Sequence, residues 1–117
     1  MAVRNIAVFC GILVATLGGP LRGDESAPPV DFNRDVRPIL SDHCFQCHGP
    51  DQGTRETELR FDRRESALAD LGGGDFAIVP GKPDDSLLYL RITSADAAVR
   101  MPPAGFHEPL NRAKIDT

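Results

Sequence analysis

One pentapeptide, CFQCH, holds the side chains best suited to chemistry in this 117-residue chain. Cys44 and Cys47 are three positions apart and His48 follows directly, whereas the remaining cysteine, Cys10, lies far upstream. This spacing fits three chemistries: a redox-active disulfide, half of a structural zinc site, and covalent attachment of haem. The rest of the sequence has to decide among them.

The spacing suits haem attachment geometrically. Residues at i and i+3 share one side of a helical turn, with Cβ atoms about 5–6 Å apart. Thiols so placed at Cys44 and Cys47 can add to the two vinyl groups on one edge of a haem, and His48 can then bind the iron through a neutral imidazole nitrogen. We therefore favour haem c, attached to the two cysteines and ligated by His48.

The competing chemistries lack supporting residues. A structural zinc site needs four Cys or His ligands, and beyond the pentapeptide only His43 and His107 remain. His43 adjoins Cys44 too closely to converge easily on the same ion. A thioredoxin-like CxxC expects a strand–helix–strand context that the sequence lacks. An inactive disulfide is the simplest alternative. The adjoining histidine and the signs of export argue against it.

An electron carrier usually has a second iron ligand, for which Met101 is the candidate. It is the only methionine after the initiator and lies 53 residues beyond His48, in a loop that two prolines hold extended. A thioether ligand would raise the reduction potential relative to an open or bis-His site. The alternatives are His107 as the ligand, an open position, and Met101 as an ordinary core residue.

Other polar residues have simpler interpretations. One of Arg60, Arg63 and Arg64 could pair with the haem propionates, because a guanidinium matches a carboxylate in a bidentate fashion. A solvated surface position is the simpler expectation for each arginine. Lys82, in a Gly-Lys-Pro turn, is expected to be exposed, and His43 is expected at the surface of a helix end.

A helix is predicted to lead the chain to Cys44. Asp31 is a suitable N-cap, and Pro38 requires either a helix start closer to Asp35 or a kink at the proline. The apolar stripe of this helix, at positions i, i+4, i+7 and i+8, consists of Phe32, Val36, Ile39 and Leu40.

The remaining pattern predicts a mainly α fold with long loops. Residues 63–71 suggest a short helix that ends at three glycines, and residues 110–117 suggest the start of a last one. Three candidate caps, residues 84–86, precede the most apolar helix of the mature chain, residues 87–92. The sequence shows no internal repeat, no coiled-coil heptad and no alternating run long enough for a sheet.

Residues 1–23 have the layout of a secretory signal peptide. Arg4 supplies a positive charge, the uncharged run Ile6–Leu17 follows, and glycines and a proline come next. Twelve residues are too few to span a bilayer comfortably, although a membrane anchor or a buried helix is the alternative. We expect an exported, periplasmic protein with no stable membrane span after cleavage.

The mature chain is acidic and small. Cleavage after residue 23 would remove two arginines and no acid, so that the net charge would change from −4 to −6. Such a charge argues against nucleic acid as a partner. Residues 24–30 resemble a proline-rich linker, and residues 31–117 contain no Trp and one Tyr. A large apolar cofactor would supply the volume that this core lacks.

Four segments, in order, resemble the planctomycete-type cytochrome c domain, a family of exported mono-haem proteins. They are FNRDVRPILSDHCFQCHGPD, LRFDRRESAL, IVPGKPDDSLLYLRI and RMPPAG. The resemblance spans residues 31–112. It implies a small cytochrome c-like helical domain around one haem c, with Cys44 and Cys47 as covalent attachments and His48 and Met101 as axial ligands. It also implies single-electron transfer to an unidentified redox partner protein, and no enzymatic activity.

The sequence differs from this family in two places. The larger domains that usually follow are absent, and the closing helix is cut short after PLNRAKIDT, so we expect a haem domain over residues 31–117 with a truncated C-terminal helix. Two other interpretations stay open. In one, the chain is a vestigial fragment of a larger exported multidomain protein. In the other, it is a haem sensor or peroxidase with an open distal site.

Overall fold

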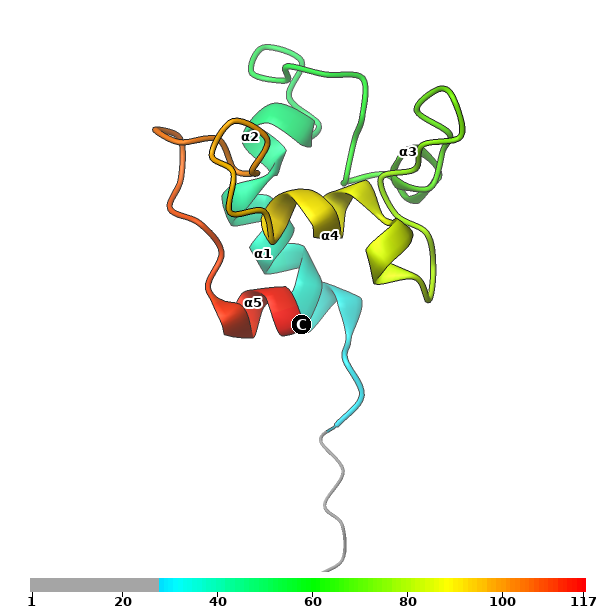
Figure 1. Ribbon diagram of the computed structural model, residues 1–117, viewed down its shortest axis with the longest axis vertical. Helices are drawn as coiled ribbons and strands as arrows, with labels where there is room; N and C mark the ends of the chain where they lie inside the picture. The colour runs from blue at the N-terminus through cyan, green and yellow to red at the C-terminus, as the bar shows by residue number, and fades with distance from the viewer. Residues whose placement is uncertain (1–27) are drawn as a thin grey trace, which may run out of the picture.

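The structure is a computed structural model that describes residues 28–117. The predicted signal peptide and most of the predicted linker lie outside the described residues. Within residues 28–117 every regular element is helical, and the β-type pairing is limited to one isolated bridge between Asp70 and Phe76. The prediction of a mainly α fold with long loops is therefore confirmed (Figure 1). The elements are a π-helix η1 (Phe32–Val36), α1 (Arg37–His43), α2 (Phe45–His48), α3 (Arg64–Ala67), a 3-10 helix η2 (Pro83–Asp85), α4 (Leu87–Ile92) and α5 (Arg112–Asp116).

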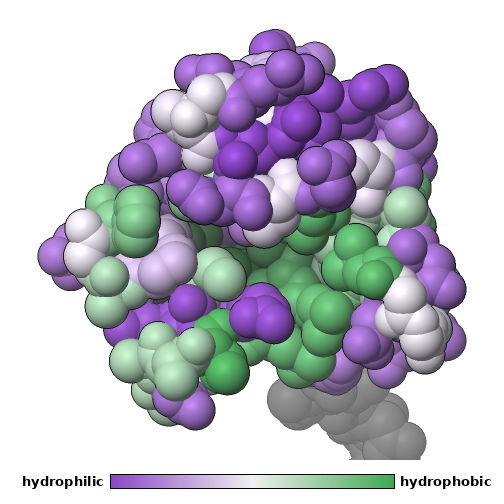
Figure 2. All heavy atoms as spheres, turned by 90° about the horizontal axis from the view of Figure 1, so that it is seen from above, coloured by the Kyte–Doolittle hydropathy of each residue, from purple (hydrophilic) through white to green (hydrophobic). Residues whose placement is uncertain are grey.

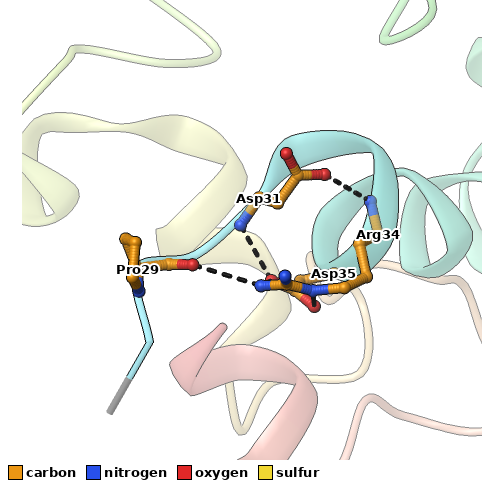
Figure 3. Close-up of polar contacts among 4 residues, drawn as sticks. All are labelled: Pro29, Asp31, Arg34 and Asp35. Carbon is orange, nitrogen blue, oxygen red and sulfur yellow. Dashed lines mark hydrogen bonds and ion pairs between the residues drawn. The ribbon is translucent and has the colours of Figure 1, made fainter. Parts of the chain in front are cut away.

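The first helix begins at the predicted N-cap. The Asp31 carboxylate accepts a hydrogen bond from the Arg34 backbone N–H at 2.8 Å, and the Asp35 carboxylate accepts one from the Asp31 N–H at 2.8 Å (Figure 3). The Arg34 guanidinium also donates to both oxygens of Asp35 at 2.7 Å. This reciprocal capping satisfies donors that a helix start leaves free. The Arg34 guanidinium and the Asp31 N–H lower the pKa of Asp35 to about 2.

Pro38 lies in the first turn of α1. Of the two predictions for this proline, a helix that starts later and a kinked helix, the structure agrees with the first. The lack of an N–H at Pro38 costs nothing there, because the first N–H groups of a helix have no partner within it. The π-helical turn η1 precedes it. Of the predicted stripe, Leu40 is buried and Val36 and Ile39 are half-buried, but Phe32 is 54% exposed. The stripe prediction is wrong at Phe32, since a π turn does not keep the 3.6-residue period.

The helix predicted over residues 63–71 is shorter than expected. It ends at Ala67, and the Asp70 side chain then accepts a hydrogen bond from the Gly72 N–H at 2.7 Å. Gly72 itself has a φ of 111°, which only glycine adopts without strain. Because an Asp side chain can replace a helical backbone partner in this way, the chain turns back early.

Ser86 joins a loop to the start of α4. Its buried hydroxyl accepts a hydrogen bond from the Val79 N–H at 2.9 Å and donates to the Lys82 carbonyl at 2.8 Å. The sequence predicts Ser86 as a cap, and it occupies the N-cap position of α4 without making a side-chain cap bond. Its hydroxyl is used to hold the loop 79–83 in place.

The last helix is confirmed over a shorter range than residues 110–117. Asn111 caps α5, with its side-chain oxygen accepting from the Lys114 N–H at 3.0 Å. Figure 1 shows α5 close to the first helix, and both helices, together with α4 and the loop 78–83, line a groove of about 340 Å³. Leu110 is buried and Ile115 is half-buried at this groove.

The core of the described residues is small. Its members are two leucines, a phenylalanine and two alanines, namely Leu40, Phe61, Ala67, Ala77 and Leu110. Seen from above, the molecule shows a hollow with hydrophobic walls inside a largely hydrophilic rim (Figure 2). The fold is therefore built around a hollow more than around a packed centre.

Candidate functional site

All four predicted site residues line one cavity of about 580 Å³. They are Cys44, Cys47, His48 and Met101. This volume lies within the range of about 300–1,000 Å³ that is typical of sites for small molecules and cofactors. The walls between them are mainly apolar and include Leu59, Phe61, Leu87, Leu88 and Ile92.

The two cysteines are held on one helical turn. The Cys44 carbonyl accepts hydrogen bonds from the N–H groups of Cys47 and His48, at 3.2 and 2.8 Å. Both thiols are free. Burial, with a smaller contribution from Cys47, raises the pKa of Cys44 to about 11, which is the reverse of the acidic thiol found in a thioredoxin-like site. Residues 28–117 contain no group of three or more His, Cys, Asp or Glu side chains that could hold a metal ion.

The orientation of His48 is fixed by hydrogen bonds on one side of its ring. Its Nδ1 lies 3.2 Å from the Leu59 carbonyl oxygen and 3.0 Å from Thr57 Oγ1. The carbonyl can only accept, so Nδ1 carries the proton and the neutral ring has its lone pair on Nε2. Within the described part of the chain no hydrogen bond involves Nε2, so this nitrogen is available to bind a metal.

The backbone around His48 is tightly constrained. The His48 carbonyl accepts from the Phe61 N–H at 2.9 Å, and the two rings pack edge to face with centroids 5.3 Å apart. Gly49 is buried, and a β-carbon at this position would collide with the Phe45 carbonyl oxygen and lie 2.8 Å from its Cα. Only glycine fits directly after the histidine.

Met101 reaches the cavity from the loop that follows α4. Its N–H donates to the Arg91 carbonyl at 3.1 Å, and the Arg91 guanidinium donates to the Val99 carbonyl at 3.3 Å. The Arg100 N–H donates to the Asp96 carbonyl at 2.9 Å. The half-buried Met101 side chain is thus supported by a hydrogen-bonded loop. His107, the alternative ligand, lines the same cavity.

The structure corrects one expectation about a basic residue. His43 is not a surface residue of a helix end: it is half-buried and lines the cavity, because Lys114 of α5 and His107 of the loop before it pack against its ring. Arg63 and Arg64 are exposed, as the simpler expectation had it, and Arg60 is half-buried beside Asp62; none of the three lines the cavity. Lys82 is exposed, as expected.

Three contributors to the site were not predicted from the sequence: Thr57, Leu59 and Arg91. Thr57 stands in a polar stretch with no motif to mark it. Leu59 acts through its carbonyl oxygen, which any residue would supply. Arg91 follows an apolar run, and its role as a support for the Met101 loop depends on how the chain folds back.

Comparison with known proteins places these residues in a family context. The family model for planctomycete cytochrome C matches residues 44–105, a range that begins at the first cysteine of the pentapeptide and includes the methionine loop. Comparisons with curated proteins and with solved structures gave no significant match. Among residues 28–117 no helix combines the length and the apolar character needed to cross a membrane.

Proposed function

Because the chain belongs to the planctomycete cytochrome c family, we propose that it binds one haem c covalently and transfers single electrons to a redox partner protein. The observation that supports this most strongly is the shared cavity, which both cysteines, His48 and Met101 line together. When bound, the haem supplies an iron that alternates between the ferrous and ferric states. The roles of the protein side chains follow from their placement.

Cys44 and Cys47 are the attachment residues. They lie on one turn that is closed by the Cys44 carbonyl, which suits two thioether bonds to one edge of the ring. The thiol of Cys44 is largely protonated at neutral pH because of its raised pKa. Cys44 is therefore kept as a thiol until it is joined to the cofactor.

His48 would bind the haem iron through Nε2. The Leu59 carbonyl and the Thr57 hydroxyl fix both its tautomer and its ring orientation. Such partners of a metal-binding histidine also make the ligating nitrogen more basic. The geometry therefore prepares Nε2 for the iron before the cofactor arrives.

Met101 would supply the second ligand to the iron. The hydrogen bonds between the loop and Arg91 hold it at the cavity wall, and the prolines that follow restrict the loop further. The apolar walls would limit the access of water to the bound iron. An iron held by both side chains would be suited to electron transfer, so we propose an electron carrier and no enzymatic activity.

The proposal includes export to the periplasm. It is supported by the charge pattern of residues 1–23, with Arg4 before the uncharged run Ile6–Leu17. The acidic charge of the mature chain argues against nucleic acid as a partner, and the partner that we propose is another redox protein.

Absorbance spectroscopy of protein matured by a c-type assembly system tests this function. We expect a low-spin c-type spectrum that changes reversibly with one electron, together with the weak long-wavelength band of a sulfur–iron bond in the oxidised form. Met101→Ala should abolish that band and lower the reduction potential. His107→Ala, the matched control in the same cavity, should change neither. A high-spin spectrum in the unchanged protein would instead support the sensor or peroxidase alternative.

A further inference from the structure

His43 makes a contact that the proposed haem site does not use. It is the last residue of α1, next to Cys44, and its Nε2 lies 2.7 Å from Lys114 Nζ of α5. Among the described residues 28–117, this is the only side-chain hydrogen bond that joins α5 to another element; the others are made within α5 or to its own N-cap. The attachment of the last helix to the cavity edge therefore depends on one imidazole nitrogen.

The chemistry of the pair fixes the protonation state of His43. A lysine ammonium is a donor only, so Nε2 of His43 must be the acceptor. In the neutral ring the proton is then on Nδ1, which is buried and has no partner within the described residues. Adding a second proton would place it on Nε2, the atom to which Lys114 donates. Protonation and the hydrogen bond exclude each other.

The surroundings of His43 favour the neutral ring. Lys114 of α5 lies against the His43 ring. The His107 ring, from the loop before α5, also packs against the His43 ring, with centroids 5.6 Å apart and an interplanar angle of 71°. Asp42, its neighbour in α1, is the opposing acid. Burial first, then Lys114 and His107, lower the pKa of His43, while Asp42 acts in the other direction. Arg91 of α4 adds a positive charge to the same cavity lining.

We propose that the His43–Lys114 hydrogen bond is a proton-sensitive contact, which holds α5 against the cavity edge and releases it when His43 is protonated. Release removes the hydrogen bond and places two positive charges side by side. What then remains to hold α5 is the limited apolar contact of Leu110 and Ile115 at the groove beside the first helix. The cavity edge formed by His43 and His107 becomes more accessible in acid.

The direction of the pH dependence follows from the lowered pKa. A base whose pKa is lower in the folded state is more protonated in the unfolded state as the pH falls below about 6.5. The contribution of His43 to the docking of α5 is therefore complete above this pH and is lost as the pH falls towards the folded-state pKa. The contact does not require the haem, so it can be tested separately from the proposed function.

Amide hydrogen exchange within α5 measures the release. The Ile115 and Thr117 N–H groups donate to Asn111 and Ala113 carbonyls at 3.1 and 3.2 Å and report on this helix. In the chain as purified, kept under reducing conditions, we expect their protection to fall about tenfold between pH 7.5 and pH 4.5 after correction for intrinsic rates, as for the loss of one charge-assisted hydrogen bond.

Three variants separate this contact from a general effect of acid. His43→Gln keeps a neutral acceptor near the position of Nε2 at every pH, so the protection of α5 should no longer depend on pH. Lys114→Met should lower the protection at pH 7.5 and remove most of its pH dependence, whereas Lys82→Met, which changes the other lysine of the described chain, should do neither. His107→Gln should keep the transition and move its midpoint to higher pH, because it removes a neighbouring basic group.

The ring nitrogens of His43 provide an independent measurement. Their NMR shifts should show the proton on Nδ1 at pH 7.5 and a midpoint that matches the loss of protection. Equal protection of α5 at both pH values in the unchanged chain would overturn the proposal. So would a transition that persists in His43→Gln, or a His43 ring that carries its proton on Nε2 at pH 7.5.

Discussion

At the scale of single residues, the hydrogen bonds of His48 matter as much as its position. Thr57 Oγ1 lies 3.0 Å from Nδ1 and 3.3 Å from the Leu59 carbonyl oxygen, so that the hydroxyl accepts from the ring and donates to the carbonyl. The outer partners of a ligating histidine raise its basicity, and a more basic ligand stabilises the ferric state. In the proposed haem site, Thr57 would therefore help to set the reduction potential.

Replacing Thr57 by valine tests this role. Thr57→Val leaves the Leu59 carbonyl as the only partner of Nδ1, which weakens electron donation to the iron. We expect the reduction potential to rise by tens of millivolts, at most roughly 60 mV, the equivalent of one hydrogen bond for a one-electron couple. Redox titration measures this shift. The control is Thr54→Val in the exposed loop nearby, and an equal shift in both variants would contradict the assignment.

The sequence was enough to propose the candidate site residues, which line one cavity, but not the groups that hold them. Spacing alone points to Cys44, Cys47 and His48, and Met101 is suggested by the scarcity of methionine and by the family resemblance. The support of His48 by Leu59 could not be predicted, because a carbonyl oxygen is common to all residues. The cavity position of His43 could not be predicted either, since it depends on Lys114, 71 residues away.

At the scale of the elements, Ser86 shows how the loops are fixed to the helices. It is 5% exposed, and its hydroxyl satisfies the Val79 N–H and the Lys82 carbonyl. In Ser86→Ala the Val79 N–H loses its partner and the Lys82 carbonyl keeps only the Asp85 N–H, so we expect the free energy of unfolding to fall by about 1–3 kcal/mol. Urea denaturation measures the change. Ser41→Ala, at an exposed position of α1, should stay within about 0.5 kcal/mol of the unchanged protein.

The capped start of the first helix predicts a sensitivity to acid. Arg34 and the Asp31 N–H lower the pKa of Asp35 from 3.8 to about 2. A depressed carboxyl pKa contributes stability above its unfolded value and loses that contribution as the pH falls through the folded value. The extra stability from Asp35 should therefore disappear between about pH 4 and pH 2.

Thermal unfolding of Asp35→Asn alongside the unchanged protein measures this contribution. The variant should be less stable at pH 6, and the two midpoints should converge as the pH approaches 2. Midpoints that differ by the same amount at pH 6 and pH 2 would show that the ionised carboxylate is not the source of the effect.

The sequence predicted that the elements are helices and the order in which they follow, but it did not predict the residues at which each helix begins and ends. The N-cap Asp31 and the helices around residues 87–92 and 110–117 are present, because caps and apolar periodicity are local signals. The exposed Phe32 and the early end of α3 depend on a π turn and on the Asp70 side chain. Both compete with helical hydrogen bonding in ways that periodicity does not encode.

At the scale of the whole molecule, the protein has a cavity where a small domain usually has its core. Five apolar side chains are buried within residues 28–117, and a cavity of about 580 Å³ lies beside them. Leu59 and Leu88, which line this cavity, are only half-buried, so filling the cavity would bury them further. The sequence indicated this shortage through its lack of tryptophan.

The chain without its cofactor should therefore be loosely packed. We expect the variant with Cys44→Ser and Cys47→Ser to bind a hydrophobic dye and to keep helical circular dichroism. Leaving even one wall side chain in contact with water costs about 1.5–3 kcal/mol, which lowers the melting temperature by at least about 6 °C in a domain of this size. The unchanged chain produced without a c-type assembly system is the control and should behave like the variant. A melting temperature equal to that of the matured protein would contradict this account.

Mass analysis of the denatured protein shows whether the pentapeptide binds haem covalently. Protein matured by a c-type assembly system should keep its haem through a denaturing gel and have the mass of the chain plus one haem. The variant with Cys44→Ser and Cys47→Ser should lose both signals, while Thr54→Val should keep them. Haem that separates from the unchanged chain on denaturation, or haem that stays with the double variant, would contradict the account.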